Sequence, residues 1–219
     1  MFNLILKDIL IQKKQIVFAM LYIIFLVFAF QSMGPAMFPA GVVAMTYMLI
    51  ITSCAYEDKN NSYMILNSLP IKRSQIVLAR YISAVIFLTI AILAYAVISQ
   101  VISISGIPLK TYPITLEYFL GALFSFSLMN AIYFPIFFKV GYMKARFVNF
   151  TLFFIFFFGI NILVSFIVHN RDEAWVKALE SFFAGKSDQA VAALLMSAIA
   201  ALLLISYGLS VKFYNDREF

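Results

Sequence analysis

Residues that could carry out acid–base, nucleophilic or metal chemistry are few and widely spaced in this chain. His169 is the only histidine and Cys54 the only cysteine among 219 residues. A zinc peptidase needs two histidines on one helix, which the sequence excludes, and no serine has a histidine partner nearby in the sequence pattern. The AGKS run at 184–187 ends like a phosphate-binding loop, but Glu180 stands where that loop has its first glycine. We therefore expect no catalytic residue, no metal ligand set and no nucleotide site.

Apolar side chains dominate the composition. The chain is 64% hydrophobic and 12% charged, whereas a soluble domain is about half apolar and a quarter charged. Six stretches approach the length of about 20 apolar residues that crosses a hydrocarbon core. These predicted spans cover 16–32, 36–55, 82–104, 118–138, 148–168 and 190–211. No aspartate or glutamate lies inside them, which disfavours an ion-coupled carrier or channel, because such proteins place ionisable residues near the midplane.

The distribution of lysine and arginine predicts the orientation. With the N-terminus inside, twelve of the 16 basic residues fall in inner segments and four in outer ones. Basic residues favour the cytoplasmic side, so both termini and residues 57–81 are expected there. The net charge of +6 fits anionic lipid headgroups and carries no argument for nucleic acid.

Two further helices are expected outside the spans. Residues 1–15 place apolar side chains at helical spacing, which predicts an amphipathic helix lying in the inner interface. Residues 169–189 form an outer insertion in which Asp172 can cap a helix that ends near Gly185. Trp175 on its apolar side is typical of a membrane interface.

The longest polar stretch, residues 57–81, reads EDKNNSYMILNSLPIKRSQIVLARY. Pro70 disfavours helical geometry at the residue before it, so the stretch should form two helical pieces. The first piece presents Tyr63, Leu66 and Leu69 on one side. Such a helix can rest on lipid or fill a groove on a partner protein, and the residues alone leave both alternatives open.

This stretch resembles the first cytoplasmic loop of ABC-2-type permeases of Gram-positive bacteria. The likeness is to the small six-span branch near the phenol-soluble modulin exporter permeases and peptide-immunity transporters. The shared pattern runs E-[KD]-x-N, then L-x-S-L-P-[IV]-x-R, then [IV]-V-x-[AS]-[KR]-Y, and residues 57–81 match nearly all of it. The rest of the chain agrees only in layout.

The resemblance implies that residues 61–69 form a coupling helix, which docks into a cleft of a cytoplasmic ATPase. ATP and magnesium would then be bound by that partner, with no cofactor in this chain. The residues implied in ATPase coupling are Glu57, Asp58, Lys59, Asn60, Asn61, Ser62, Tyr63, Leu66, Asn67, Leu69, Pro70, Lys72 and Arg73.

Together these features predict an all-α membrane protein with one permease domain over residues 1–219. It has six transmembrane helices, an N-terminal amphipathic helix, a cytoplasmic coupling helix and an outer interfacial helix. The expected function is the permease subunit of an ATP-driven ABC-2-type exporter in a bacterial cell membrane. Expected partners are separate ABC ATPase subunits, a second permease copy or paralogue, and lipid.

The expected cargo is hydrophobic or amphipathic, because the spans hold no acidic residue and the chain has 25 phenylalanines. The resemblance favours membrane-active peptides, such as antimicrobial peptides. The alternative functions are an ion-coupled carrier or channel, and a non-transporting membrane assembly partner.

The basic asymmetry generates a topology prediction. Cysteines introduced at Asn61 and Ser187, in a Cys54→Ala background, should react from opposite sides of the membrane. An impermeant maleimide added to intact cells should label position 187 and leave position 61 unlabelled until the membrane is opened. Labelling of position 61 from outside would contradict the orientation.

Overall fold

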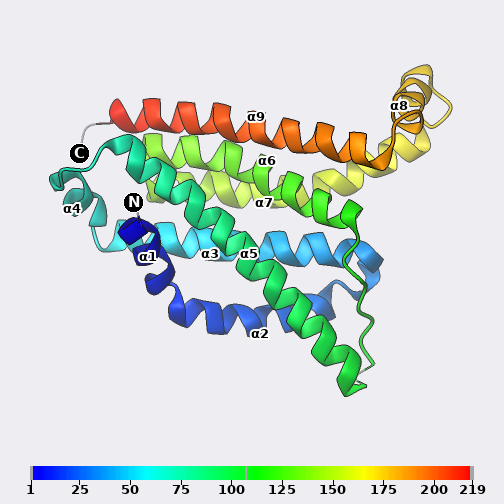
Figure 1. The fold of residues 1–219 in the computed structure, drawn as a ribbon, viewed down its shortest axis with the longest axis horizontal. Coiled ribbons are helices and arrows are strands. Elements are labelled where there is room, and N and C mark those ends of the chain that lie inside the picture. The colour runs from blue at the N-terminus through cyan, green and yellow to red at the C-terminus, as the bar shows by residue number, and fades with distance from the viewer. Residues whose placement is uncertain (1, 107, 218–219) are drawn as a thin grey trace.

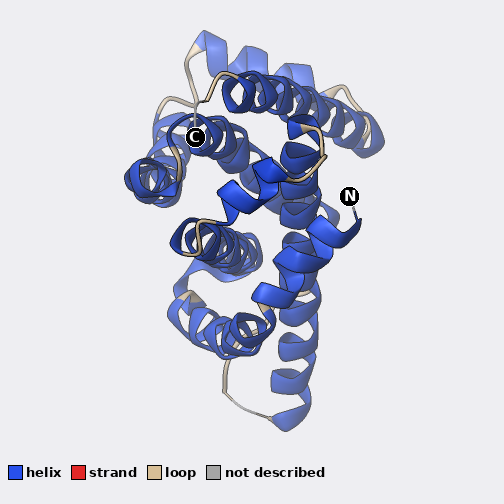
Figure 2. Cartoon of the chain, turned by 90° about the vertical axis from the view of Figure 1, so that its left-hand side faces the viewer, coloured by secondary structure: helices blue, strands red, loops and turns tan. Residues whose placement is uncertain are grey.

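The computed structural model describes residues 2–106 and 108–217, apart from the side chains of residue 19 and of several residues between 157 and 184. Helices and loops make up all of this described part, so the all-α prediction is confirmed for it (Figure 2). The helices in chain order are α1 (Phe2–Ile11), α2 (Lys13–Ala29), the 3-10 helix η1 (Gln31–Ala36), α3 (Met37–Lys59), α4 (Ser62–Ser68), α5 (Arg73–Ser105), α6 (Leu116–Val140), α7 (Tyr142–His169), α8 (Ala174–Ala184) and α9 (Asp188–Asn215).

The long helices form an elongated bundle, shown in Figure 1. Helix α3 runs through the middle, with α6, α7 and α9 on one side and α2 on the other, and α5 crosses the bundle obliquely. Both termini and α4 lie at one end of the bundle, and α8 lies at the opposite end. This arrangement places the segments that were predicted to be cytoplasmic together.

Four helical stretches in the described residues are long and apolar enough to cross a membrane: 31–59, α5, α6 and α9. They contain the spans expected at 36–55, 82–104, 118–138 and 190–211. The bent pair α1–α2 would make a fifth crossing. The spans expected at 16–32 and 148–168 overlap α2 and α7, and the count of six stays a prediction.

A group of hydroxyls holds α5, α6 and α9 together inside the bundle. Tyr81 on α5 lies with its hydroxyl 2.6 Å from Ser206 Oγ and 2.9 Å from Ser210 Oγ, both on α9. Ser206 Oγ in turn donates to the Ala131 carbonyl of α6 at 2.9 Å. Hydrogen bonds of this kind add to close packing, which drives helix association where water is absent.

Two glutamines fix the ends of α2. Gln12, fully buried, donates through Nε2 to the Leu49 carbonyl at 3.1 Å and to Thr52 Oγ1 at 2.9 Å, both on α3. At the other end, Gln31 Nε2 donates to the Lys110 carbonyl at 3.1 Å, and the Lys110 amide donates back to Gln31 Oε1 at 3.0 Å. The helix is therefore tied to α3 at one end and to the α5–α6 loop at the other.

The outer insertion contains a helix, α8, as expected. It begins at Ala174, and Asp172 lies before it, 3.8 Å from Lys177 Nζ. Trp175 is 47% exposed and stacks on Phe166 of α7, with ring centroids 6.1 Å apart. Among the α8 side chains that the structure describes, Val176 is buried, whereas about half of the neighbouring indole is open to the surroundings.

Candidate functional site at the α4 end of the bundle

The loop between α3 and α5 takes its shape from two residues. Asn61 adopts a left-handed conformation, with φ of 48°, and turns the chain from the end of α3 into α4. Asparagine tolerates this region better than most residues. Leu69 is extended, with ψ of 149°, because the following Pro70 disfavours helical geometry there. The break at Pro70 is therefore confirmed, and the second helical piece, α5, begins at Arg73.

Helix α4 has an inner and an outer side. Leu66 points into the bundle and is only 5% exposed. The outer side presents Met64, Ile65 and Leu69, which are 55%, 64% and 44% exposed. The apolar surface open to a partner is therefore built from these three residues. The prediction of Tyr63, Leu66 and Leu69 as one outward face is wrong for Leu66, since that side chain already packs within the chain.

Polar contacts fasten this loop to the end of α9. Asn67 Nδ2 lies 3.3 Å from Tyr214 Oη. Arg73 Nη1 donates to the carbonyls of Tyr214 and Asn215 at 2.9 Å, and its guanidinium lies over the Tyr214 ring. The last carbonyls of a helix lack partners within it and carry partial negative charge, so an arginine there is favourable. The base of α4 is thus held against α9.

Beneath α4 lies a buried charge cluster, formed by Lys7 and Asp8 of α1, Glu57 of α3 and Arg80 of α5. Arg80 Nη1 is 3.2 Å from Asp8 Oδ2, and Arg80 Nη2 pairs with Glu57 Oε2. Arg80 Nη1 also donates to Ser53 Oγ at 2.7 Å. Lys7 Nζ lies 3.2 Å from Glu57 Oε2 and 3.3 Å from Asp8 Oδ1. Two cations and two carboxylates give the cluster no net charge.

The cluster corrects the expected placement of α1. Asp8 and Gln12 were expected on the polar side of an interfacial helix, but they are 3% and 0% exposed and face the bundle. Phe2, Leu6 and Leu10 are exposed apolar residues of α1, and Asn3 is exposed beside them. The helix therefore turns its apolar side outward, toward the expected lipid, and its polar side toward Arg80.

The residues expected to couple to an ATPase divide between these two environments. Glu57 is buried in the charge cluster, Leu66 is buried beneath α4, and Asn67 and Arg73 bond to the end of α9. Asp58 and Tyr63 line a small cavity that also includes Tyr214. The positions left exposed at the surface are Lys59, Asn60, Asn61, Leu69, Pro70 and Lys72, with Ser62 partly buried.

Four functional candidates were missed from the sequence: Lys7, Asp8, Arg80 and Ile65. The expected spans ended at 55 and began at 82, so Glu57 and Arg80 fell just outside them. In the structure α3 continues to Lys59 and α5 begins at Arg73, which places both charges inside continuous helices. An available signal was the spacing of Leu4, Asp8 and Gln12, which recur every four residues and so share one helix face.

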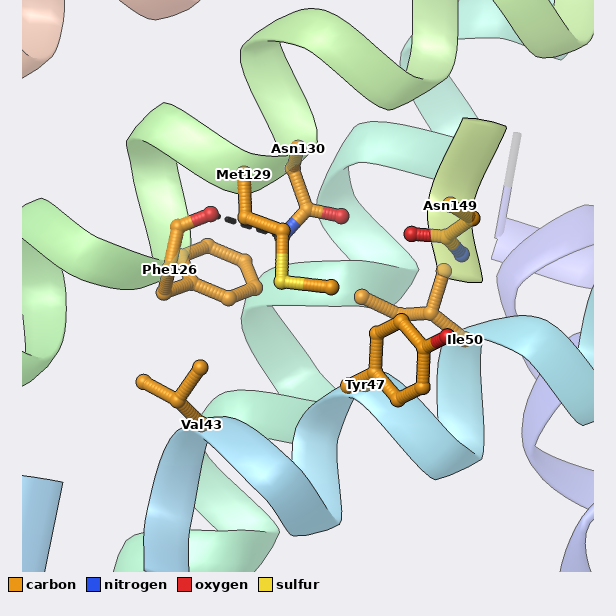
Figure 3. A pocket seen from close by; sticks show the side chains of 7 residues that line it. All are labelled: Val43, Tyr47, Ile50, Phe126, Met129, Asn130 and Asn149. Atoms are coloured by element: carbon orange, nitrogen blue, oxygen red, sulfur yellow. Dashed lines mark hydrogen bonds between the residues drawn. The ribbon is translucent and has the colours of Figure 1, made fainter. Parts of the chain in front are cut away.

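A second polar site lies deeper in the bundle, where α3, α6 and α7 meet. Figure 3 shows the amides of Asn130 and Asn149 facing one another, with Tyr47 beside them. Asn130 Nδ2 donates to the Phe126 carbonyl at 2.7 Å, whereas Asn149 Oδ1 is buried without a hydrogen-bond partner. The cavity that they line measures about 10 Å³, close to the smallest that holds one water molecule. This pocket is too small to admit a cargo in the present arrangement.

Neither site gathers the ligands that a metal ion requires. Within the described residues, no group of three or more histidine, cysteine, aspartate or glutamate side chains is placed to bind a metal. The two carboxylates of the charge cluster face an arginine and a lysine. Their chemistry is therefore that of an ionic link between helices.

The cluster generates a stability prediction. Arg80→Met leaves Asp8 and Glu57 buried with only Lys7 to offset them, so the variant should lose about 3–5 kcal/mol of stability. The variant Lys7→Met/Asp8→Leu/Glu57→Met/Arg80→Met removes all four charges together and should unfold close to the wild-type temperature, since apolar side chains of similar volume replace a buried ion group with little loss. Thermal unfolding in detergent measures both. A single variant as stable as the wild type would contradict the buried ionic link.

Comparison with protein families identifies the chain. Residues 3–215 match the family described as ABC-2 family transporter protein, whereas no curated protein gives a significant match. Family membership implies the membrane subunit, or permease, of an ABC exporter, which works with an ABC ATPase. The match covers the charge cluster, α4 and the long apolar helices together. The chain therefore belongs to the ABC-2 family of transporter proteins.

Proposed function

We propose that this permease moves a hydrophobic or amphipathic cargo out of a bacterial cell, and that a separate ATPase drives it through α4. The finer assignment is to the six-span Gram-positive branch near the phenol-soluble modulin exporter permeases, working as a dimer with membrane-active peptides as cargo. The observation that carries the proposal is that α4 has one side buried against the bundle and one apolar side exposed. On its inner side Leu66 is buried beside residues of α1 and α5 and Asn67 bonds to α9, whereas its outer side presents three apolar residues.

Covering this outer side with a protein groove would stabilise a docked complex. Fully burying a Leu, Ile or Met side chain is worth about 1.5–3 kcal/mol. Met64, Ile65 and Leu69 are each about half exposed, so covering them contributes about 3 kcal/mol in total. A difference of that size changes the occupancy of a complex by about a hundredfold.

An apolar cavity in the bundle supports the proposal of a hydrophobic cargo. It has a volume of about 370 Å³ and lies between α5, α6 and α9, lined mainly by aliphatic and aromatic side chains that include Leu78, Val85, Phe134 and Leu203. The one amide at its wall is Asn130. Such a surface favours an aliphatic side chain or an acyl tail over an ion, because it offers little to replace the water that an ion would lose.

The docking part of the proposal is tested at Ile65. The change Ile65→Asp places a charge on the outer side of α4, and burying an unpaired carboxylate in a groove costs several kcal/mol. The variant should insert and fold normally, but co-purifying ATPase should fall about a hundredfold. The controls Ile65→Met and Lys72→Ala keep the apolar surface and should retain the ATPase. If Ile65→Asp retains the ATPase and its ATP hydrolysis, α4 rests on lipid and the docking assignment is wrong.

The cargo part is tested with a defined probe. A dansyl-labelled amphipathic helix of leucine and lysine should accumulate in inside-out vesicles that hold the permease and its ATPase when ATP is supplied. A polar peptide of the same length and charge, with serine in place of leucine, should not accumulate. Equal uptake of the two peptides, or uptake without ATP, would exclude an ATP-driven exporter selective for amphipathic peptides.

A further inference from the structure

The charge cluster lies directly beneath the proposed docking helix. Leu66, the inward residue of α4, lines a small cavity together with Leu4, Asp8, Glu57 and Arg80. Glu57 is on the last turn of α3, five residues before α4 begins at Ser62. A displacement of α4 can therefore be passed to the charge cluster by two routes. One is the contact of Leu66 with the small cavity, and the other is the short Asn60–Asn61 turn.

Arg80 joins three helices through one rigid group. Its guanidinium contacts Asp8 on α1 and both Glu57 and Ser53 on α3, while its own backbone belongs to α5. The planar fork of arginine holds its partners in a fixed geometry, and the side chain is 6% exposed, so water screens these bonds little. Hydrophobic contacts in the same place would hold the helices together without fixing their direction, because such contacts are non-directional.

We propose that Arg80 is a positioning residue for energy coupling, which links α1 and α5 to the end of α3 so that a displacement of α4 moves the three helices together. This inference rests on the proposed function, because it takes α4 as the point where the ATPase acts. The cluster carries no net charge, so it can shift as a unit without exposing an unpaired ion. Helix α5 then carries the displacement to Ser105 at the opposite end, about 38 Å away at 1.5 Å per residue.

A labelling experiment separates positioning from simple stabilisation. A reporter cysteine replaces Ser105, exposed at the far end of α5, in a Cys54→Ala background. The complex with its ATPase is placed in lipid nanodiscs, and the rate of maleimide labelling is measured with and without magnesium ATP. In the parent chain we expect ATP to change the labelling rate by about tenfold, which corresponds to about 1.4 kcal/mol of coupling free energy.

The decisive variant is Lys7→Met/Asp8→Leu/Glu57→Met/Arg80→Met, which keeps the fold by replacing all four charges together. It should bind the ATPase in parent amounts and hydrolyse ATP, yet lose the effect of ATP on position 105. Arg80→Lys keeps one positive charge but lacks the fork that reaches two carboxylates, and it should lose most of the effect. If the fourfold variant fails to assemble, Arg80→Lys decides the question.

Tyr81→Phe is the matched control. It removes the hydrogen bonds from α5 to Ser206 and Ser210, one residue away from Arg80, and should keep the ATP effect. An unchanged ATP effect in the charge variants would overturn the proposal, and so would loss of the effect in Tyr81→Phe, since any weakening of α5 would then suffice. If the parent chain binds no ATPase or shows no ATP effect, the proposed function itself fails, which is a different result from failure of the charge variants alone.

Discussion

A guanidinium taken out of water on an apolar helix must be neutralised where it lies, because an unpaired buried charge costs several kcal/mol. Arg80 is 5% exposed, and two carboxylates from two other helices meet it. This requirement explains why α1 turns Asp8 inward and leaves Phe2 and Leu10 outside. It also fixes the end of α3 relative to α5, and thereby the place where the chain enters α4.

A second arginine, Arg73, links helices at the same end of the bundle through hydrogen bonds to backbone carbonyls. Arg73 satisfies carbonyls at the end of α9, and Asn67 reaches the Tyr214 hydroxyl. Helix α4 is therefore supported by α1, α3 and α5 on one flank and by α9 on the other. A seven-residue helix is too short to be stable in water alone, so its order comes from these neighbours. The neighbouring helices therefore hold the outer residues of α4 in a defined position.

The sequence supported the helical class, the break at Pro70 and the outer helix α8, because each follows from local composition or from proline geometry. It predicted less well which residues of α4 face the bundle. Tyr63, Leu66 and Leu69 share an apolar spacing. Which of them is buried depends on residues far away in sequence, namely Leu4, Ile76 and Phe138. The charge cluster was missed for a related reason. Asp8 and Arg80 are 72 residues apart, and a span boundary two residues from Arg80 hid it among the inner basic residues.

The two glutamines at the ends of α2 have a mechanical consequence. Gln12 binds α3 and Gln31 binds the Lys110 backbone, so a slide of α2 by one helical turn, about 5.4 Å, would break the bonds at both ends. Between these two anchored ends lies the exposed middle of the helix, which carries Phe18, Leu21 and Phe25. Helix α2 is thus restrained along its axis at both ends, while its apolar middle faces outward.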